Sequence, residues 1–180
     1  MNITVYLGAN PGTDPAIEDA AREFGAWIGK SGNSLVYGGS KGGLMGLLAT
    51  SALDAGAYVT GVEPEFFLEE GLQLDEVSEL IATKTMAERK AKMIELGDAF
   101  VVFPGGSGTL EEASDVMSRI SLKHLDAPCI FFNHNGYYNE LKALLAKMID
   151  MGFSTPQRQE GIVFASNIEQ VEACIEQMQA

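Results

Sequence analysis

Short apolar runs alternate with longer segments of helical periodicity along the whole chain. The apolar runs predict strands at residues 2–8, 34–37, 57–62, 78–82, 98–103, 128–132 and 161–165. The periodic segments predict helices at residues 15–30, 43–55, 86–96, 108–122, 138–151 and 167–178. Strands that alternate with helices are typical of right-handed βαβ crossovers. The pattern therefore predicts a Rossmann-like, doubly wound α/β fold, a mainly parallel sheet of about seven strands with helices on both faces.

Local signals refine this pattern at two places. Asp14 before Pro15 is a good N-cap followed by proline at the first helical position, so the first long helix should begin there. Residues 63–75 fit a loop or a short helix, and we expect this segment to overhang a ligand site. No fixed-period repeat, low-complexity tract or linker interrupts the sequence, so we expect one domain over residues 1–180.

Three glycine-bearing segments follow predicted strands, at residues 8–12, 38–46 and 104–109. In a doubly wound sheet the ligand crevice lies beyond the carboxyl ends of the strands. These three loops should emerge at that edge and enclose one nucleotide. Residues 104–112, Pro-Gly-Gly-Ser-Gly-Thr-Leu-Glu-Glu, carry the strongest signal, because a glycine turn into a helix N-terminus offers backbone N–H groups and a positive dipole end to a phosphate.

Other nucleotide and metal motifs do not fit. None of the loops has the G-x-G-x-x-G spacing of dinucleotide-binding proteins, since Glu111 stands where the third glycine would be. Residues 25–31 have one residue too few between their glycines for a P-loop and lie at the end of a helix. His124 and His134 have no Cys or carboxylate at ligand spacing, so we expect loop or surface histidines and no metal site.

The charge of the chain narrows the class of ligand. A formal net charge of -13 argues against binding a nucleic acid polymer, which depends on clustered Lys and Arg. Lys84, Arg89, Lys90 and Lys92 form one local concentration of positive charge that suits a small phosphorylated ligand. The alternative is a solvated helix face in which Glu88 pairs with Lys92.

Nothing in the sequence indicates export or membrane insertion. The N-terminus has no basic leader, and the longest nearly apolar stretch, residues 44–53, falls short of the ~20 residues that a membrane-spanning helix needs. The two cysteines, Cys129 and Cys174, do not suggest a disulfide scaffold. We expect a cytoplasmic protein with reduced thiols and no membrane partner.

Each candidate side chain also has a plain structural interpretation. Thr109 and Glu112 match the S/T-x-x-E capping box, as do Thr85 and Glu88, for which we accept that interpretation. Arg89 fits an exposed helical arginine. It also lies early in a helix that follows a parallel strand, which places it at the same sheet edge as the glycine loops. Thr109 suits both a phosphate contact and a helix cap. Met45 and Met86 suit either a nucleobase or the core.

Three segments together resemble the LOG (Lonely Guy) family of cytokinin riboside 5′-monophosphate phosphoribohydrolases: residues 37–46, residues 86–90 and residues 104–112. The resemblance implies a homodimeric hydrolase of nucleoside 5′-monophosphates, with Arg89 and Glu112 as catalytic residues and no cofactor. Members have been labelled lysine decarboxylases, but no pyridoxal-phosphate site is visible. By resemblance and loop position, the expected substrate-binding residues are Gly8, Gly38, Gly39, Met45, Met86, Lys90, Gly105, Gly106, Ser107, Gly108 and Thr109.

The chain departs from the family pattern at two positions that bear on substrate preference. Ala87 stands where the family commonly has His, and Ser107 stands where an aromatic residue is common. The resemblance also allows a partner subunit to contribute Arg119. Two alternatives stay open: a nucleotide- or molybdenum-cofactor carrier, since related carriers have similar loops, and a purely structural α/β domain. Retention of both Arg89 and Glu112 favours the enzyme.

Overall fold

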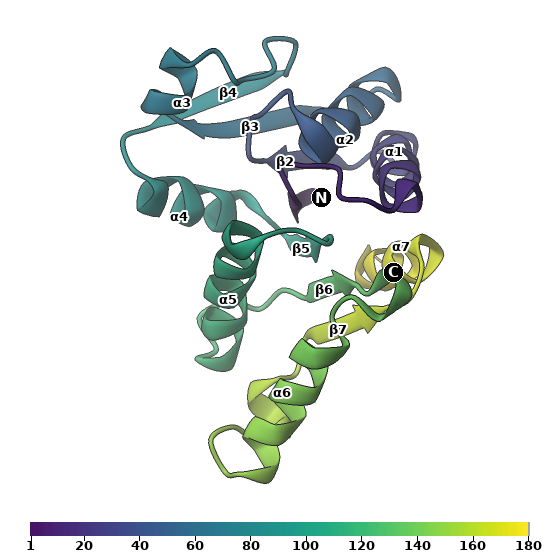
Figure 1. Cartoon of the computed structure of the whole chain (residues 1–180), viewed down its shortest axis with the longest axis vertical. Coiled ribbons are helices and arrows are strands. Elements are labelled where there is room, and N and C mark those ends of the chain that lie inside the picture. Colours follow the sequence, from purple (N-terminus) through teal and green to yellow (C-terminus); the bar gives the residue numbers. More distant parts are fainter. Residues whose placement is uncertain (180) are drawn as a thin grey trace.

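The chain folds around one sheet in the order β4-β3-β2-β1-β5-β6-β7 (Figure 1). This computed structural model describes residues 1–179. Neighbouring strands all pair in parallel. The fold is therefore the predicted Rossmann-like α/β arrangement. The strands are β1 (Asn2–Tyr6), β2 (Ser34–Tyr37), β3 (Val59–Pro64), β4 (Glu79–Thr83), β5 (Ala99–Val102), β6 (Cys129–Phe132) and β7 (Ile162–Ala165).

Helices connect the strands in the predicted sequence positions. The first begins where expected, because the Asp14 side chain accepts a hydrogen bond from the Ala16 N–H at 3.0 Å. No helix in residues 1–179 is long and apolar enough to cross a membrane. The α-helices are α1 (Pro15–Lys30), α2 (Gly43–Asp54), α3 (Glu65–Glu69), α4 (Met86–Leu96), α5 (Ser107–Ser121), α6 (Asn139–Asp150) and α7 (Ile168–Gln179), with 3-10 turns at His134–Gly136 and Pro156–Arg158.

Two strands end two residues away from their predicted ends. β1 ends at Tyr6, two residues earlier than expected, and the chain continues as a loop through Gly8. β3 runs on to Pro64, because Glu63 and Pro64 pair with Ala82 and Thr83 of β4. The extension brings Glu63 into the sheet, where the apolar pattern alone predicts a loop.

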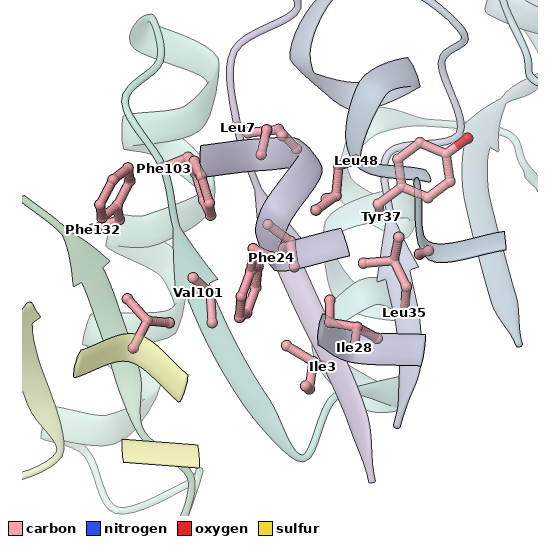
Figure 2. Packing of buried hydrophobic residues seen from close by; sticks show 14 of the residues in the cluster. Ile3, Leu7, Phe24, Ile28, Leu35, Tyr37, Leu48, Val101, Phe103 and Phe132 are labelled. Atoms are coloured by element: carbon pink, nitrogen blue, oxygen red, sulfur yellow. The ribbon is translucent and has the colours of Figure 1, made fainter. Parts of the chain in front are cut away.

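Two hydrophobic layers cover the sheet. Residues of α1, α2 and α7 pack on one face, and residues of α4, α5 and α6 pack on the other. Figure 2 shows the first layer, in which Phe24 and Ile28 of α1 lie over Ile3, Leu35 and Val101 of three neighbouring strands. All five side chains are fully buried. Burial on both faces explains why β5 and β6 are apolar throughout rather than alternating.

The order of the strands fixes where a ligand can bind. From β1 the chain proceeds outward through β2, β3 and β4, and it then returns to place β5 on the other side of β1. The loops that follow β1 and β5 therefore diverge toward opposite faces and leave a crevice between them. Both of these loops are among the three glycine-bearing segments.

Candidate active site

A cavity of about 380 Å³ opens at the carboxyl ends of β1, β2 and β5. All three glycine-bearing segments contribute to it, as predicted from their positions. Arg89 and Glu112 also line it. The predicted binding residues in its wall are Gly8, Gly38, Met45, Met86, Lys90, Gly106, Ser107, Gly108 and Thr109. The structure therefore brings together most of the predicted set. Gly39 and Gly105 do not line the cavity, although each belongs to a loop that contributes to it.

The loop after β5 presents backbone donors to this cavity. α5 begins at Ser107 with Gly106 as its N-cap residue, and the first hydrogen bond within the helix runs from the Leu110 N–H to the Gly106 carbonyl at 3.1 Å. The N–H groups of residues 107–109 precede that bond and have no partner within the helix. Together with the positive end of the helix dipole, they form a site suited to an anion such as phosphate.

Gly105 is required by packing. A Cβ atom at Gly105 would overlap the hydroxyl of the buried Thr109 side chain and lie 3.0 Å from the backbone nitrogen of Gly8. Gly106 and Gly108 have open space where their Cβ atoms would lie. A hydrogen bond of 3.3 Å from the Gly8 N–H to the Pro104 carbonyl joins the first and third loops. The anion site is therefore held by close backbone contacts around Gly105.

Two consecutive tyrosines support the same loop, and sequence reasoning missed both. The Tyr137 hydroxyl donates to the Gly105 carbonyl at 2.6 Å, and the Tyr138 hydroxyl donates to the Phe103 carbonyl at 2.6 Å. Tyr138 is buried, whereas Tyr137 is half-exposed. A buried tyrosine hydroxyl normally finds a hydrogen-bond partner. Two consecutive tyrosines at the start of an amphipathic helix were therefore the signal in the sequence for such contacts.

His134 contacts the N-cap residue of α1. It lies in the 3-10 turn that precedes these tyrosines, and its Nε2 is 2.9 Å from a carboxylate oxygen of Asp14. Asn135 also contacts the same carboxylate. These contacts tie the N-terminus of α1 to the turn that carries Tyr137.

Arg89 is buried, so its interpretation as an exposed helical arginine is wrong. Its guanidinium group donates in three directions: Nη1 to Glu112 Oε1 at 2.6 Å, Nε to the Val62 carbonyl at 3.0 Å, and Nη2 to the Gly38 carbonyl at 3.4 Å. A Cβ atom at Gly38 would overlap Nη2. Glycine at this position is therefore what lets the arginine lie against the β2 loop.

Glu112 does not form the capping box that its sequence pattern allows. Thr109 lies inside α5 rather than at its N-cap, and the Glu112 side chain turns instead to Arg89. The carboxylate side chain is 11% exposed. Burial raises its pKa above the ordinary value, and the hydrogen-bonded Arg89 guanidinium acts in the opposite direction. The result is a buried carboxylate and guanidinium pair in the wall of the cavity.

The other capping signature is confirmed with one change. The Thr85 hydroxyl accepts a hydrogen bond from the Glu88 N–H at 3.1 Å. The Glu88 carboxylate accepts from the Lys84 N–H at 2.9 Å, one residue before the expected partner. Because Glu88 is used here, the alternative pair with Lys92 does not form, and Lys92 pairs with Glu95 instead.

Lys90 belongs to the cavity, in contrast to Lys92. Its ammonium group pairs with the Glu111 carboxylate, which comes from α5 on the far side of the site. The Lys90 side chain is 17% exposed, whereas that of Glu111 is 65% exposed. The concentration of positive charge predicted on this helix therefore divides into Arg89 and Lys90 at the site and Lys92 outside it.

Glu63 is a second buried carboxylate near Arg89, and sequence reasoning did not single it out. It is 2% exposed, and its Oε2 atom has no hydrogen-bond partner within residues 1–179. Burial raises the pKa of Glu63 to about 7, with Arg89 acting in the opposite direction. A glutamate directly after a strand-like apolar run was the only signal for it in the sequence.

The predicted overhang between β3 and β4 contains the short helix α3, and Phe67 from this helix lines the cavity. Two backbone hydrogen bonds join the overhang to the β2 loop: the Lys41 N–H donates to the Leu72 carbonyl at 2.8 Å, and the Leu74 N–H donates to the Gly39 carbonyl at 2.9 Å. The β2 loop and the overhang are therefore one paired unit over the site.

Comparison with known proteins gives a consistent family assignment. A family profile described as "Possible lysine decarboxylase" matches residues 45–177. A cytokinin riboside 5′-monophosphate phosphoribohydrolase from Rhodococcoides fascians is 39% identical over 176 residues, 97% of this chain and 88% of that protein. A protein of the same name from Arabidopsis thaliana is 36% identical over 169 residues, 94% of this chain and 79% of that protein.

Solved structures are similar at a more distant level. The molybdenum cofactor carrier protein of Chlamydomonas reinhardtii superposes with a TM-score of 0.76 at 22% identity, covering 99% of this chain and 97% of that one. The molybdenum cofactor binding protein of Rippkaea orientalis gives a TM-score of 0.71 at 19% identity, again covering 99% of this chain and 97% of that one. At this identity the likeness describes the fold alone. The relatives that share sequence along nearly the whole chain decide the family, and this protein belongs to the LOG family of cytokinin riboside 5′-monophosphate phosphoribohydrolases.

Proposed function

We propose that this protein hydrolyses the N-glycosidic bond of adenosine 5′-monophosphates, including N6-modified ones, to the free base and ribose 5-phosphate. Water adds to the anomeric carbon as the bond to the base nitrogen breaks, and a proton passes to the departing base. The observation that carries the proposal is the buried Arg89–Glu112 pair in the wall of the same cavity as the anion site at the start of α5.

Glu112 has the chemistry that the ribose requires. Cleavage builds positive charge on the sugar ring, which a nearby carboxylate stabilises. Only one of its oxygens is held by Arg89. Its second oxygen is the one we assign to the ribose hydroxyls or the attacking water. Arg89 offsets negative charge that develops on the base or already lies on the phosphate.

The anion site positions the substrate through its 5′-phosphate. Backbone N–H groups of residues 107–109 and the hydroxyl groups of Ser107 and Thr109 supply donors around the start of α5. Lys90 adds a positive charge at the rim. Because binding energy from a remote group orients the reacting bond, removal of the phosphate should lower kcat/KM strongly.

The apolar part of the cavity is suited to the base. Met45, Met86 and Phe67 line it, and Phe67 comes from the overhang between β3 and β4. We propose that this overhang, with Ala87 and Ser107 where the family commonly has larger residues, decides between adenine and N6-modified adenine.

We further propose a cytoplasmic homodimer built from a single domain. Cys129 is buried and Cys174 is partly buried, and both are free, as suits a reducing compartment. Arg119 forms an ion pair of 3.2 Å with Asp115 on the surface of α5, and its side chain is 39% exposed. It is therefore accessible to complete the pocket of a partner subunit.

The proposal is tested by incubating the purified protein with AMP and, separately, with isopentenyladenosine monophosphate. Free base and ribose 5-phosphate are followed by chromatography. Glu112→Gln should lower turnover by at least about 100-fold, the lower end of the range for a positioned acid or base. Glu95→Gln, an exposed helical glutamate paired with Lys92, is the matched control and should keep wild-type turnover.

The outcomes separate the competing functions. Release of base that depends on Glu112 supports a phosphoribohydrolase, and the ratio between the two substrates reports base preference. Absence of release from both nucleotides, with tight binding retained, would favour a nucleotide or cofactor carrier instead.

A further inference from the structure

Glu63 is the buried carboxyl group that the proposed mechanism does not use. Its side chain projects from β3 toward the β2 loop, where a Cβ atom at Gly39 would lie 2.6 Å from Glu63 Oε2. Gly39 has a positive φ of 86°, so both its conformation and its contact with Glu63 require glycine. The carboxyl group is therefore packed against the backbone of the loop that lines the candidate active site.

The neighbouring donors are already occupied. The Tyr37 hydroxyl donates to the Gly39 carbonyl at 3.0 Å, and the Leu74 N–H donates to the same carbonyl. Glu63 Oε2 is thus left without a partner within residues 1–179. A buried acceptor that is desolvated and unpaired is costly, and such a group needs a functional or structural reason to be there.

Arg89 is the cation available to this carboxyl group. The Arg89 side chain is anchored on the Val62 carbonyl, one residue before Glu63, and its Nη1 is taken by Glu112. Its third donor atom, Nη2, makes only a long hydrogen bond of 3.4 Å to the Gly38 carbonyl. The guanidinium group therefore contacts the residues directly before Glu63 in β3 and directly before Gly39 in the β2 loop, and its weakest contact is on that loop.

The other ionisable groups around Glu63 are few. Tyr37 of β2 faces it, and Glu76, from the loop before β4, acts on Tyr37 from farther away. Among residues 1–179, Arg89 on α4 is the one charged side chain with a marked electrostatic effect on Glu63. Glu112 on α5 lies on the other side of Arg89. The state of Glu63 therefore acts mainly on Arg89.

We propose that Glu63 is a positioning residue of this site. In its ionised form, Glu63 is a second anionic partner for Arg89 and draws the guanidinium group away from Glu112. In its protonated form, Glu63 leaves the Arg89–Glu112 pair intact. Ionisation releases one proton to solvent, and no other group changes its covalent state. For catalysis the inference rests on the proposed function, because it concerns the same Arg89 and Glu112.

Burial places this ionisation in a useful range. The pKa of Glu63 is raised to about 7, so both forms are populated near neutral pH. Arg89 then has two arrangements whose balance follows pH. Ribose hydroxyls that engage Glu112 would favour the arrangement in which Arg89 turns toward Glu63.

The direct test follows the Arg89 side chain by NMR and needs no substrate. The Nε–Hε resonance of Arg89, assigned by its loss in Arg89→Lys, is recorded from pH 5 to pH 9. In the wild-type protein it should shift with a midpoint near pH 7, as expected for Glu63. In Glu63→Gln, which keeps the shape and removes the charge, this transition should be lost. Glu65→Gln, an exposed neighbour on α3, should keep it.

Glu63→Asp provides a second variant that keeps an ionisable group. It should retain a transition with a displaced midpoint. A transition with the wild-type midpoint in Glu63→Gln or in Glu63→Asp would overturn the proposal, as would a flat wild-type profile.

The same variants also give a kinetic measurement. The pH profile of AMP cleavage should contain the ionisation near pH 7 in the wild-type protein and lose it in Glu63→Gln, whereas a merely structural role would lower the rate equally at all pH values. A wild-type protein that cleaves no nucleotide refutes the proposed function, while the NMR transition still decides whether Glu63 controls Arg89.

Discussion

The two ends of the cavity are built from different materials. At the α5 end, backbone N–H groups and glycines form the surface, and two tyrosine hydroxyl groups hold the loop from behind. At the β2 and β3 end, the buried Arg89 pairs with the buried Glu112, and a second buried carboxyl group, Glu63, packs against Gly39 of the β2 loop. The first end has a fixed charge distribution supplied by peptide dipoles, whereas the charge at the second depends on protonation.

This difference predicts different sensitivities. A site made of backbone groups is sensitive to any atom that moves the loop and is insensitive to pH. A site made of buried charges is sensitive to the loss of any one partner, because the remaining charge is left desolvated and unpaired. Four experiments test this contrast, from the largest expected effect to the smallest.

Among changes at the charged end, Arg89→Ala should lower the stability of the folded protein most. Removal of the guanidinium group leaves Glu112 buried without its partner, for which a loss of about 3–5 kcal/mol in the free energy of unfolding is expected. Urea unfolding at pH 7 measures it. Lys92→Ala, which removes a surface pair with Glu95, should stay within about 0.5 kcal/mol of wild type. Equal losses in the two variants would contradict the contrast.

Gly105→Ala should damage the backbone end. The added methyl group would overlap the Thr109 hydroxyl, and overpacking of this kind costs about 1–3 kcal/mol. Gly108→Ala is the matched control, since its Cβ has open space and alanine favours a helix over glycine by about 0.5–1 kcal/mol. Thermal unfolding should separate the two variants in opposite directions. If both lower the stability alike, the loop is not held by the packing of Gly105 on Thr109.

Glu63 should make stability depend on pH. Its pKa rises from an ordinary 4.5 to about 7 on folding, so the folded state holds the proton more tightly than the unfolded chain. The contribution of this tighter proton binding to the free energy of unfolding is complete below about pH 4.5. It is lost as the pH rises toward 7, by at most about 1.4 kcal/mol per pH unit. The difference in unfolding free energy between the wild type and Glu63→Gln, measured from pH 5 to pH 8, should show this decline. A difference that is constant with pH would falsify it.

Tyr137→Phe should have the smallest effect and should be confined to the phosphate. It removes one hydrogen bond to the Gly105 carbonyl, worth about 0.5–1.5 kcal/mol. We therefore expect the KM for AMP to rise roughly 2- to 10-fold with little change in kcat. Tyr58→Phe, a half-exposed tyrosine just before β3, is the control. A fall in kcat at unchanged KM would point to a role for Tyr137 other than holding the phosphate loop.

The sequence predicted the backbone end of the site far better than the charged end. The segment at residues 104–112 specifies its conformation locally, through glycines, a strand before it and a helix after it, and it formed as expected. Its supports, Tyr137 and Tyr138, lie more than 30 residues along the chain from the carbonyl groups that their hydroxyl groups bind, so these contacts form only in the folded chain.

The positions of the buried charged side chains depend on tertiary contacts even more strongly, so the sequence alone predicts them less well. Arg89 and Glu112 were identified through a family resemblance, while their local patterns allowed an exposed arginine and a helix cap. Glu63 was placed in a loop, because a strand predicted from apolar periodicity stops at the first charged residue. Pairing with β4 carries β3 past that point, and the Glu63 side chain is buried in the resulting sheet.

The pairing of the β2 loop with the overhang has a consequence for engineering and for the divergence of relatives. The Gly39–Leu74 and Lys41–Leu72 hydrogen bonds link segments separated in the chain by all of α2 and β3. Phe67, which faces the cavity, is carried by the same unit. A graft of the overhang alone from another protein would leave these backbone partners mismatched. New base preference is therefore most readily transferred by exchanging the two segments together, as one cassette.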